Sequence, residues 1–122
     1  MIDRVSLDHP ALIVDDEEDN LDALQELLAL EGQAAETALG GQAAVDRFRR
    51  GERFDLVLCD IGMPGLSGWQ VVDEIRRLAP ETKVWLVTAW ANDIPSDDPR
   101  RRKVRGILPK PLDFDYVHQL VS

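Results

Sequence analysis

The stretch Leu56-Val-Leu-Cys-Asp60 sets the fold class, because four apolar residues in a row end in a carboxylate. The same arrangement occurs at Ala11-Leu-Ile-Val14, which precedes Asp15-Asp16, and at Val84-Trp-Leu-Val87, which precedes Thr88. Short apolar runs that do not alternate with polar residues are typical of strands buried on both faces of a parallel sheet. We therefore predict three central strands, each of which ends in a polar side chain.

Helical periods separate these runs. Apolar residues recur at helical spacing over residues 21–31, and Gly32 then provides a C-terminal stop. A weaker period covers residues 44–48, and a clear one covers residues 71–78, just before Pro80. We therefore predict a helix after each of the first three strands.

Two further strands complete the pattern. Gln33–Leu39 is rich in alanine and poor in β-branched residues, which favours an edge position. Gly106-Ile-Leu108 is a short fifth strand, and a helix is expected over residues 113–122. Strand and helix thus alternate five times, which predicts an α/β fold with an open parallel sheet between two layers of helices. In such sheets, ligands bind outside the carboxyl ends of the strands.

Composition bounds the possible functions. The chain has 122 residues, with 14 Lys+Arg against 23 Asp+Glu and a net charge of -9. This length predicts a single domain over residues 1–122, with its core at about residues 11–121. The excess of acid argues against direct binding of nucleic acid. Cys59 has no partner for an internal disulfide, and no apolar stretch is long enough to cross a membrane, so we expect a cytoplasmic setting.

Five polar residues lie at or just beyond the carboxyl ends of the predicted strands. They are Asp15, Asp16, Asp60, Thr88 and Lys110. Three carboxylates and one ammonium group leave an excess of negative charge, which a divalent cation would cancel. Oxygen donors without a His or Cys cluster favour Mg²⁺. Lys110 and Thr88 then suit donors to a phosphoryl group, and Asp60, at the end of the middle strand, suits a nucleophile that forms an aspartyl phosphate.

In their order, these motifs resemble the receiver domain of two-component response regulators. The motifs are Val14-Asp-Asp16, Asp60-Ile-Gly-Met-Pro-Gly65 with Gly68, Thr88-Ala89 and Lys110-Pro111, and the resemblance covers about residues 11–121. It implies a flavodoxin-like (βα)5 fold with strand order 2-1-3-4-5. It also implies a switch that takes a phosphoryl group from a histidine kinase or a histidine phosphotransfer protein and regulates a partner protein or output domain. Such a domain catalyses its own phosphorylation and dephosphorylation and is not an enzyme acting on a separate substrate.

The resemblance implies a role for each matching residue of the metal site. Asp60 resembles the phosphoacceptor and Asp16 the direct Mg²⁺ ligand. Asp15 would assist through water, and the backbone carbonyl of Gly62 would be a further ligand.

The resemblance also implies a phosphoryl-binding and switch region. Thr88 and Lys110 would hold the phosphoryl oxygens, and Ala89 would belong to the switch segment. The Lys110-Pro111 peptide bond is often cis in this family, which proline tolerates at small cost.

Two departures from the family pattern affect switching. Ile107 stands where receivers usually carry Tyr or Phe, so the familiar aromatic switch is missing. Trp90, two residues after Thr88, is large for its place, and we hypothesise that it shields the acyl phosphate or takes over part of the switching. Prolines 95 and 99 interrupt the segment 92–103, where the family has its fourth helix. We expect that helix to be short, displaced or irregular, which leaves output and dimer formation through this face open.

Three alternative functions remain. A receiver fold could serve as a docking module without phosphorylation; the complete set of acids, Thr88 and Lys110 argues against this alternative, while Ile107 and the broken fourth helix keep it open. A small Mg²⁺-dependent phosphatase of the haloacid dehalogenase type would need a DxDx(T/V) motif where Asp15-Asp-Glu-Glu-Asp19 stands. A flavodoxin-like binder would need a phosphate loop rich in Ser, Thr and Gly at the same place.

Simpler interpretations apply to several charged or polar residues. Asp15 and Asp16 could merely cap the first helix. The basic run Arg100–Arg105 is either a solvated face neutralised by neighbouring acids, Asp97 and Asp98, or a docking surface for an acidic partner. Cys59, inside a strand, is expected to be a small core residue.

Overall fold

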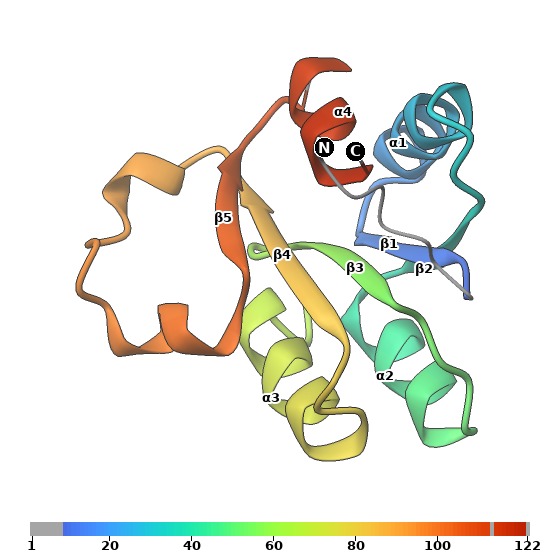
Figure 1. Ribbon diagram of the computed structural model, residues 1–122. Helices are drawn as coiled ribbons and strands as arrows, with labels where there is room; N and C mark the ends of the chain where they lie inside the picture. Colours follow the sequence, from blue (N-terminus) through green and yellow to red (C-terminus); the bar gives the residue numbers. More distant parts are fainter. Residues whose placement is uncertain (1–8, 113, 122) are drawn as a thin grey trace.

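The computed structural model describes residues 9–112 and 114–121, in which five parallel strands form one sheet (Figure 1). The order β2-β1-β3-β4-β5 places the reversal of strand order between β1 and β3. The strands are β1 (Ala11–Asp15), β2 (Ala35–Leu39), β3 (Leu56–Asp60), β4 (Lys83–Thr88) and β5 (Gly106–Pro109). The predicted flavodoxin-like sheet with order 2-1-3-4-5 is confirmed.

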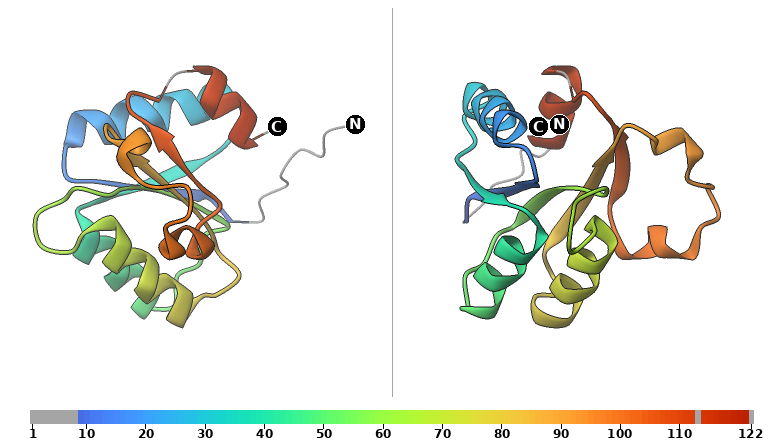
Figure 2. Two further views of the ribbon diagram at one scale, coloured as in Figure 1. Left: turned by 90° about the vertical axis from the view of Figure 1, so that its left-hand side faces the viewer. Right: turned by 180° about the vertical axis from the view of Figure 1, so that it is seen from behind.

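Helices cover both faces of the sheet (Figures 1 and 2). On one face lie α1 (Glu18–Leu30) and α4 (Phe114–Val121), and on the other lie α2 (Gly41–Arg49) and α3 (Gly68–Leu78). Both β1 and β3 are buried along their whole length, as their apolar runs predict. Each face of the sheet carries its own apolar cluster, so the molecule has three layers.

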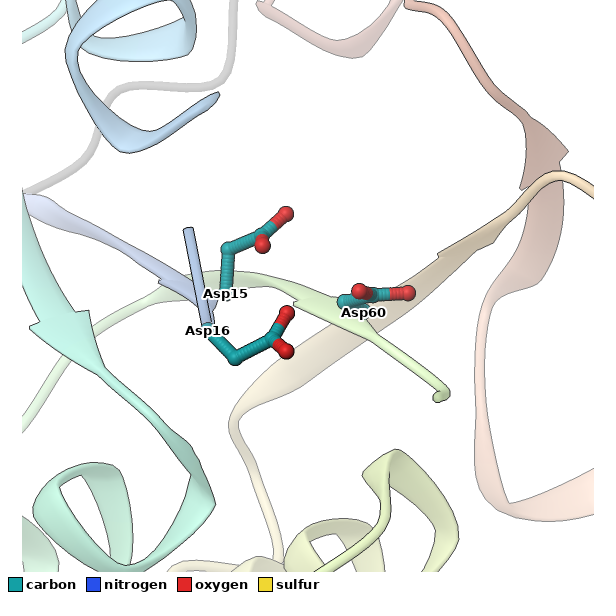
Figure 3. A group of neighbouring side chains, drawn as sticks. All are labelled: Asp15, Asp16 and Asp60. Atoms are coloured by element: carbon teal, nitrogen blue, oxygen red, sulfur yellow. The ribbon is translucent and has the colours of Figure 1, made fainter. Parts of the chain in front are cut away.

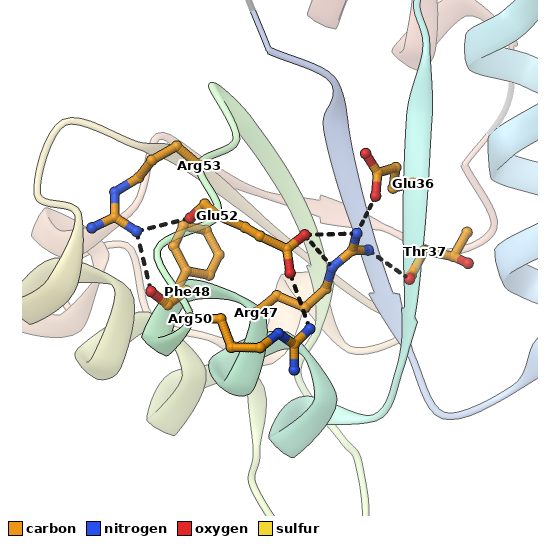
Figure 4. Close-up of polar contacts among 7 residues, drawn as sticks. All are labelled: Glu36, Thr37, Arg47, Phe48, Arg50, Glu52 and Arg53. Carbon is orange, nitrogen blue, oxygen red and sulfur yellow. Dashed lines mark hydrogen bonds and ion pairs between the residues drawn. The ribbon is translucent and has the colours of Figure 1, made fainter.

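The weak strand β2 lies at the edge, as its composition predicts, and Ala38 is its one buried residue. Arg47 of α2 binds to this edge strand through polar contacts (Figure 4). Its guanidinium donates to the backbone carbonyl of Thr37 at 3.2 Å and forms ion pairs with Glu36 of β2 and Glu52 beyond α2. Because a free edge strand invites pairing with other chains, this side chain both holds β2 and occupies one of its backbone acceptors.

The segment between β4 and β5 contains two short 3-10 turns, η1 (Ala91–Asp93) and η2 (Pro99–Lys103), instead of an α-helix. The expectation of an irregular fourth helix is therefore confirmed. The segment loops away from the sheet and returns beside α3 (Figures 1 and 2).

Two contacts hold this returning turn against α3. The guanidinium carbon of Arg100 lies 4.3 Å from the ring centroid of Trp69, and Lys103 Nζ lies 2.8 Å from Asp73 Oδ1. Arg100 also pairs with Asp98 at 2.7 Å, so part of the basic run is neutralised as one interpretation predicts. Asp73 on α3 and Asp98, just before η2, therefore neutralise two cations of this run, Lys103 and Arg100.

Helix α3 starts directly against the end of β3. Ser67 and Gln70 form a capping box, in which Ser67 Oγ accepts from the Gln70 N–H at 3.3 Å. The N–H of Gly68 donates to the carbonyl of Ile61 at 2.8 Å, and a Cβ on Gly68 would lie 2.4 Å from the carbonyl oxygen of Asp60. The helix can approach the strand this closely only because residue 68 has no side chain.

We predict that Gly68→Ala lowers the free energy of unfolding by about 2–3 kcal/mol, because the added methyl group would collide with the backbone of Asp60 and Ile61. Urea denaturation measures this change. Gly62→Ala is the matched control, since a Cβ there meets no atom within 4 Å, and it should change stability by less than about 0.5 kcal/mol. Equal effects of the two substitutions would contradict the close approach.

Candidate functional site

Three carboxylates converge at the carboxyl ends of β1 and β3 (Figure 3). Asp15 is the last residue of β1, Asp16 follows it, and Asp60 ends β3. One carboxylate oxygen from each lies within 4.8 Å of the others. The parallel sheet brings them together because neighbouring strands end at the same edge, as the sequence predicts.

Lys110 joins two of these carboxylates. Its Nζ lies 3.0 Å from Asp15 Oδ2 and 3.1 Å from Asp60 Oδ2. Its backbone N–H donates to the carbonyl of Thr88 at 3.0 Å, which sets the end of β5 beside the end of β4. The pairing spans 95 positions of sequence, so it forms only once the sheet has its observed strand order.

The site holds more negative charge than Lys110 can balance. Burial raises the pKa of Asp60, and the hydrogen bond from Lys110 opposes this rise without cancelling it. Burial also acts to lower the pKa of Lys110, but the hydrogen bonds to Asp15 and Asp60 outweigh it and the pKa of Lys110 is raised. Both directions follow from an ammonium group shared between carboxylates in a partly desolvated site.

Asp15 is held by several donors and is 2% exposed. Its Oδ1 accepts from the Glu17 N–H at 3.0 Å, and its Oδ2 accepts from Lys110 and, at 3.5 Å, from Asn20. Glu17 occupies the cap position of α1 and its side chain makes no cap hydrogen bond, so neither Asp15 nor Asp16 is the cap residue.

Asn20 is a site residue that the sequence analysis missed. It contacts Asp15 and lines a cavity of about 360 Å³ beside Lys110, with Leu24 and Leu27 of α1 forming an apolar wall. No sequence motif marks an amide in the first turn of a helix as a site residue. The one indication in the sequence is that Asn20 follows Asp15 by five residues.

The end of β4 supplies Thr88, which is 3% exposed and lies on the strand next to β3. Its Oγ1 accepts from the Trp90 N–H at 3.2 Å, so the hydroxyl proton stays available for another acceptor. Ala89 follows at the end of the strand. The side chain of Trp90 is 66% exposed and therefore does not pack into the core.

The other predicted residues also have definite places. Gly62 follows β3, and its backbone contacts the Asp60 carboxylate. Ile107 of β5 is partly buried against the apolar cluster on the α2–α3 face. The Lys110-Pro111 peptide bond is cis. Cys59 is fully buried beside Asp60, as predicted for a core residue, and burial raises the pKa of its thiol strongly.

The chemistry of this donor set fits a hard divalent cation. All three candidate ligands are carboxylates, and they lie close enough for one ion to reach an oxygen of each. Burial, and to a smaller extent the charge of Asp15, raise the pKa of Asp60, so the ionised form of Asp60 calls for further compensation by a cation. A metal ion would supply that compensation.

Most of the chain matches a known family of signalling domains. Residues 11–122 match the family described as the response regulator receiver domain. The chain belongs to this family. It is 37% identical over 101 residues to a response regulator receiver protein of Anaeromyxobacter sp. (strain Fw109-5), covering 83% of the chain and 42% of that protein. It is 35% identical over 104 residues to the transcriptional regulatory protein ZraR of Escherichia coli K12, covering 85% of the chain and 23% of ZraR.

Solved receiver structures have the same fold. The response regulator protein TrrA of Thermotoga maritima, in complex with Mg²⁺-BeF, superposes with a TM-score of 0.81 at 34% identity, covering 93% of this chain and 96% of that one. A receiver domain from Clostridium thermocellum gives a TM-score of 0.82 at 24% identity, covering 93% and 90%, and this shows the fold alone. Receiver domains are signalling domains. In the described part of the chain, no helix has the length and apolar character to cross a membrane.

We predict that Asp60→Asn raises the thermal unfolding midpoint of the metal-free protein by a few degrees at pH 7.5. A carboxylate whose pKa is raised on folding contributes stability at low pH and loses it as pH rises through the folded pKa. The advantage of the variant should therefore shrink as pH falls toward 4.

The matched control is Asp22→Asn, which removes the same charge from an exposed position of α1. Thermal melts of both variants after treatment with a chelating resin provide the comparison. An Asp60→Asn protein less stable than wild type at pH 7.5 would contradict the excess of charge at the site.

Proposed function

We propose that this receiver domain accepts a phosphoryl group on Asp60 with the help of Mg²⁺ and then changes conformation to regulate a partner protein or output domain. The donor would be the phosphohistidine of a histidine kinase or a histidine phosphotransfer protein. The observation that carries the proposal is the meeting of Asp60 with Lys110 and two further carboxylates at the carboxyl end of the sheet. Mg²⁺-BeF bound to TrrA supports the same site chemistry.

Asp60 is the carboxylate best placed to act as the nucleophile. Asp15 is more deeply buried and its oxygens already accept from Glu17, Asn20 and Lys110. Asp16 is exposed and lies just beyond the end of β1. The Asp60 carboxylate accepts from Lys110 and from the backbone of Gly62 and is less buried than that of Asp15.

Asp15, Asp16 and Asp60, with the backbone carbonyl of Gly62, would hold Mg²⁺. When bound, the ion neutralises the carboxylates and the oxygens of the incoming phosphoryl group. The residues of the chain provide the rest of the site. Lys110 would move from the carboxylate pair to a phosphoryl oxygen, and the hydroxyl of Thr88 would donate to another.

The transfer itself exchanges one bond for another. A carboxylate oxygen of Asp60 attacks phosphorus, the phosphorus–nitrogen bond of the phosphohistidine breaks, and the imidazole retains the electron pair and takes up a proton. Phosphorylation would then act as a switch because Thr88 and Lys110 bind the added charge better in one conformation than in the other. Ala89, Trp90, Ile107 and Pro111, which lie close to Thr88 and Lys110 in the sequence, would report the change.

The experiment is incubation with acetyl phosphate, with and without Mg²⁺, followed by intact mass measurement of wild type and Asp60→Asn. We predict a Mg²⁺-dependent gain of one phosphoryl group, about 80 Da, which Asp60→Asn abolishes. Lys110→Gln should retain the fold and strongly slow the gain. No gain under any condition would overturn the proposal and favour a docking module that is not phosphorylated.

Trp90→Ala should change the rate of dephosphorylation, because the indole lies two residues from Thr88 and its backbone N–H holds the Thr88 hydroxyl. Mass measurement over time, after removal of acetyl phosphate, gives this rate. Trp90→Phe is the control that keeps an aromatic ring. An unchanged rate in Trp90→Ala would show that the side chain neither shields the acyl phosphate nor takes part in switching.

A further inference from the structure

A second charged site lies at the opposite end of the sheet from the carboxylates. A recess of about 340 Å³ opens between the end of α3, the start of β4 and the turn η2. Five cationic side chains and one acidic side chain, Glu81, line this basic recess. The cationic residues are Arg76, Lys83, Arg102, Lys103 and Arg105. The recess is therefore positively charged, although the chain as a whole has a net charge of -9.

Most of this positive charge is not neutralised within the described part of the chain. Lys103 pairs with Asp73 at 2.8 Å. None of the other four cations has a carboxylate within salt-bridge distance among residues 9–112 and 114–121. Lys83, Arg102 and Arg105 are exposed, so their charged groups are free to turn toward a ligand.

Arg76 gives the recess a fixed cationic wall. Its Nη1 donates to the carbonyl of Pro80 at 2.8 Å and its Nη2 to the carbonyl of Thr82, which locks the guanidinium in place. Its Nε is buried and has no hydrogen-bond acceptor among the described residues. Burial lowers the pKa of Arg76, and the nearby charge of Glu81 opposes this effect only in part. A guanidinium held in a fixed position beside several other cations attracts anions, phosphate above all.

We propose that the basic recess binds a small polyanion of the phosphate-ester or polyphosphate class. Its size suits a small ligand, and several cations converge on it from three elements of the fold. The apolar lining residues are Pro80, Val84 and Val104, and they offer no aromatic or leucine anchor of the kind that protein interfaces use. An extended nucleic acid would reach past the recess onto the acidic remainder of the surface, where it is repelled.

The test is isothermal titration calorimetry of the whole chain with inorganic tripolyphosphate. The protein is first passed over a chelating resin, so that no metal can recruit the anion to the carboxylate site. We expect a single site with a Kd below about 1 mM at moderate salt. The double variant Lys83→Gln/Arg105→Gln should raise the Kd by about tenfold or more, because it removes two converging charges. Circular dichroism checks that it folds.

Two controls separate the basic recess from general charge and from the carboxylate site. Arg50→Gln/Arg77→Gln removes the same charge from two arginines outside the recess, each 63% exposed, and should leave the Kd unchanged. Lys110→Gln should also leave it unchanged. Absence of binding, equal loss in either control, or tighter binding of a glutamate-rich peptide or a single-stranded oligonucleotide than of tripolyphosphate would overturn the proposal.

Discussion

The ammonium group of Lys110 between Asp15 and Asp60 is the interaction on which the rest of the site depends. It joins the carboxyl ends of β1 and β3 to the residue that follows β5. Two buried carboxylates this close would repel each other without it. Because the three residues come from distant parts of the chain, the contact requires the strand order β1-β3-β4-β5.

The sheet positions Lys110 and Asp60, and contacts of their backbones with neighbouring elements restrict how both residues can move. Helix α3 begins against the backbone of Asp60, where Gly68 leaves no room for a side chain. Lys110 is tied through its own backbone to the carbonyl of Thr88. Asp60 is therefore linked to the start of α3 through its backbone and to the end of β4 through Lys110. The irregular turn η2, fixed to α3 through Arg100 and Trp69, extends this connection toward the basic recess.

Sequence reasoning recovers the parts of the molecule that follow from local chemistry. A strand buried on both faces must be apolar throughout, so β1, β3 and β4 are visible as short runs, and prolines 95 and 99 exclude a regular helix. Contacts between distant segments leave no comparable pattern in the sequence. The amide of Asn20 beside Asp15, the close seat of Gly68 and the convergence of the five recess cations depend on the tertiary fold, and the sequence shows only some of the residues concerned.

We propose that one of three adjacent carboxylates, Asp60, carries the phosphoryl group. Borohydride reduces an aspartyl phosphate to homoserine, and tandem mass spectrometry of the digested protein then locates the modified position. After incubation with acetyl phosphate and Mg²⁺, we predict homoserine at position 60, with Asp15 and Asp16 unchanged. Homoserine at position 15 or 16, or unmodified aspartate at all three positions, would contradict it.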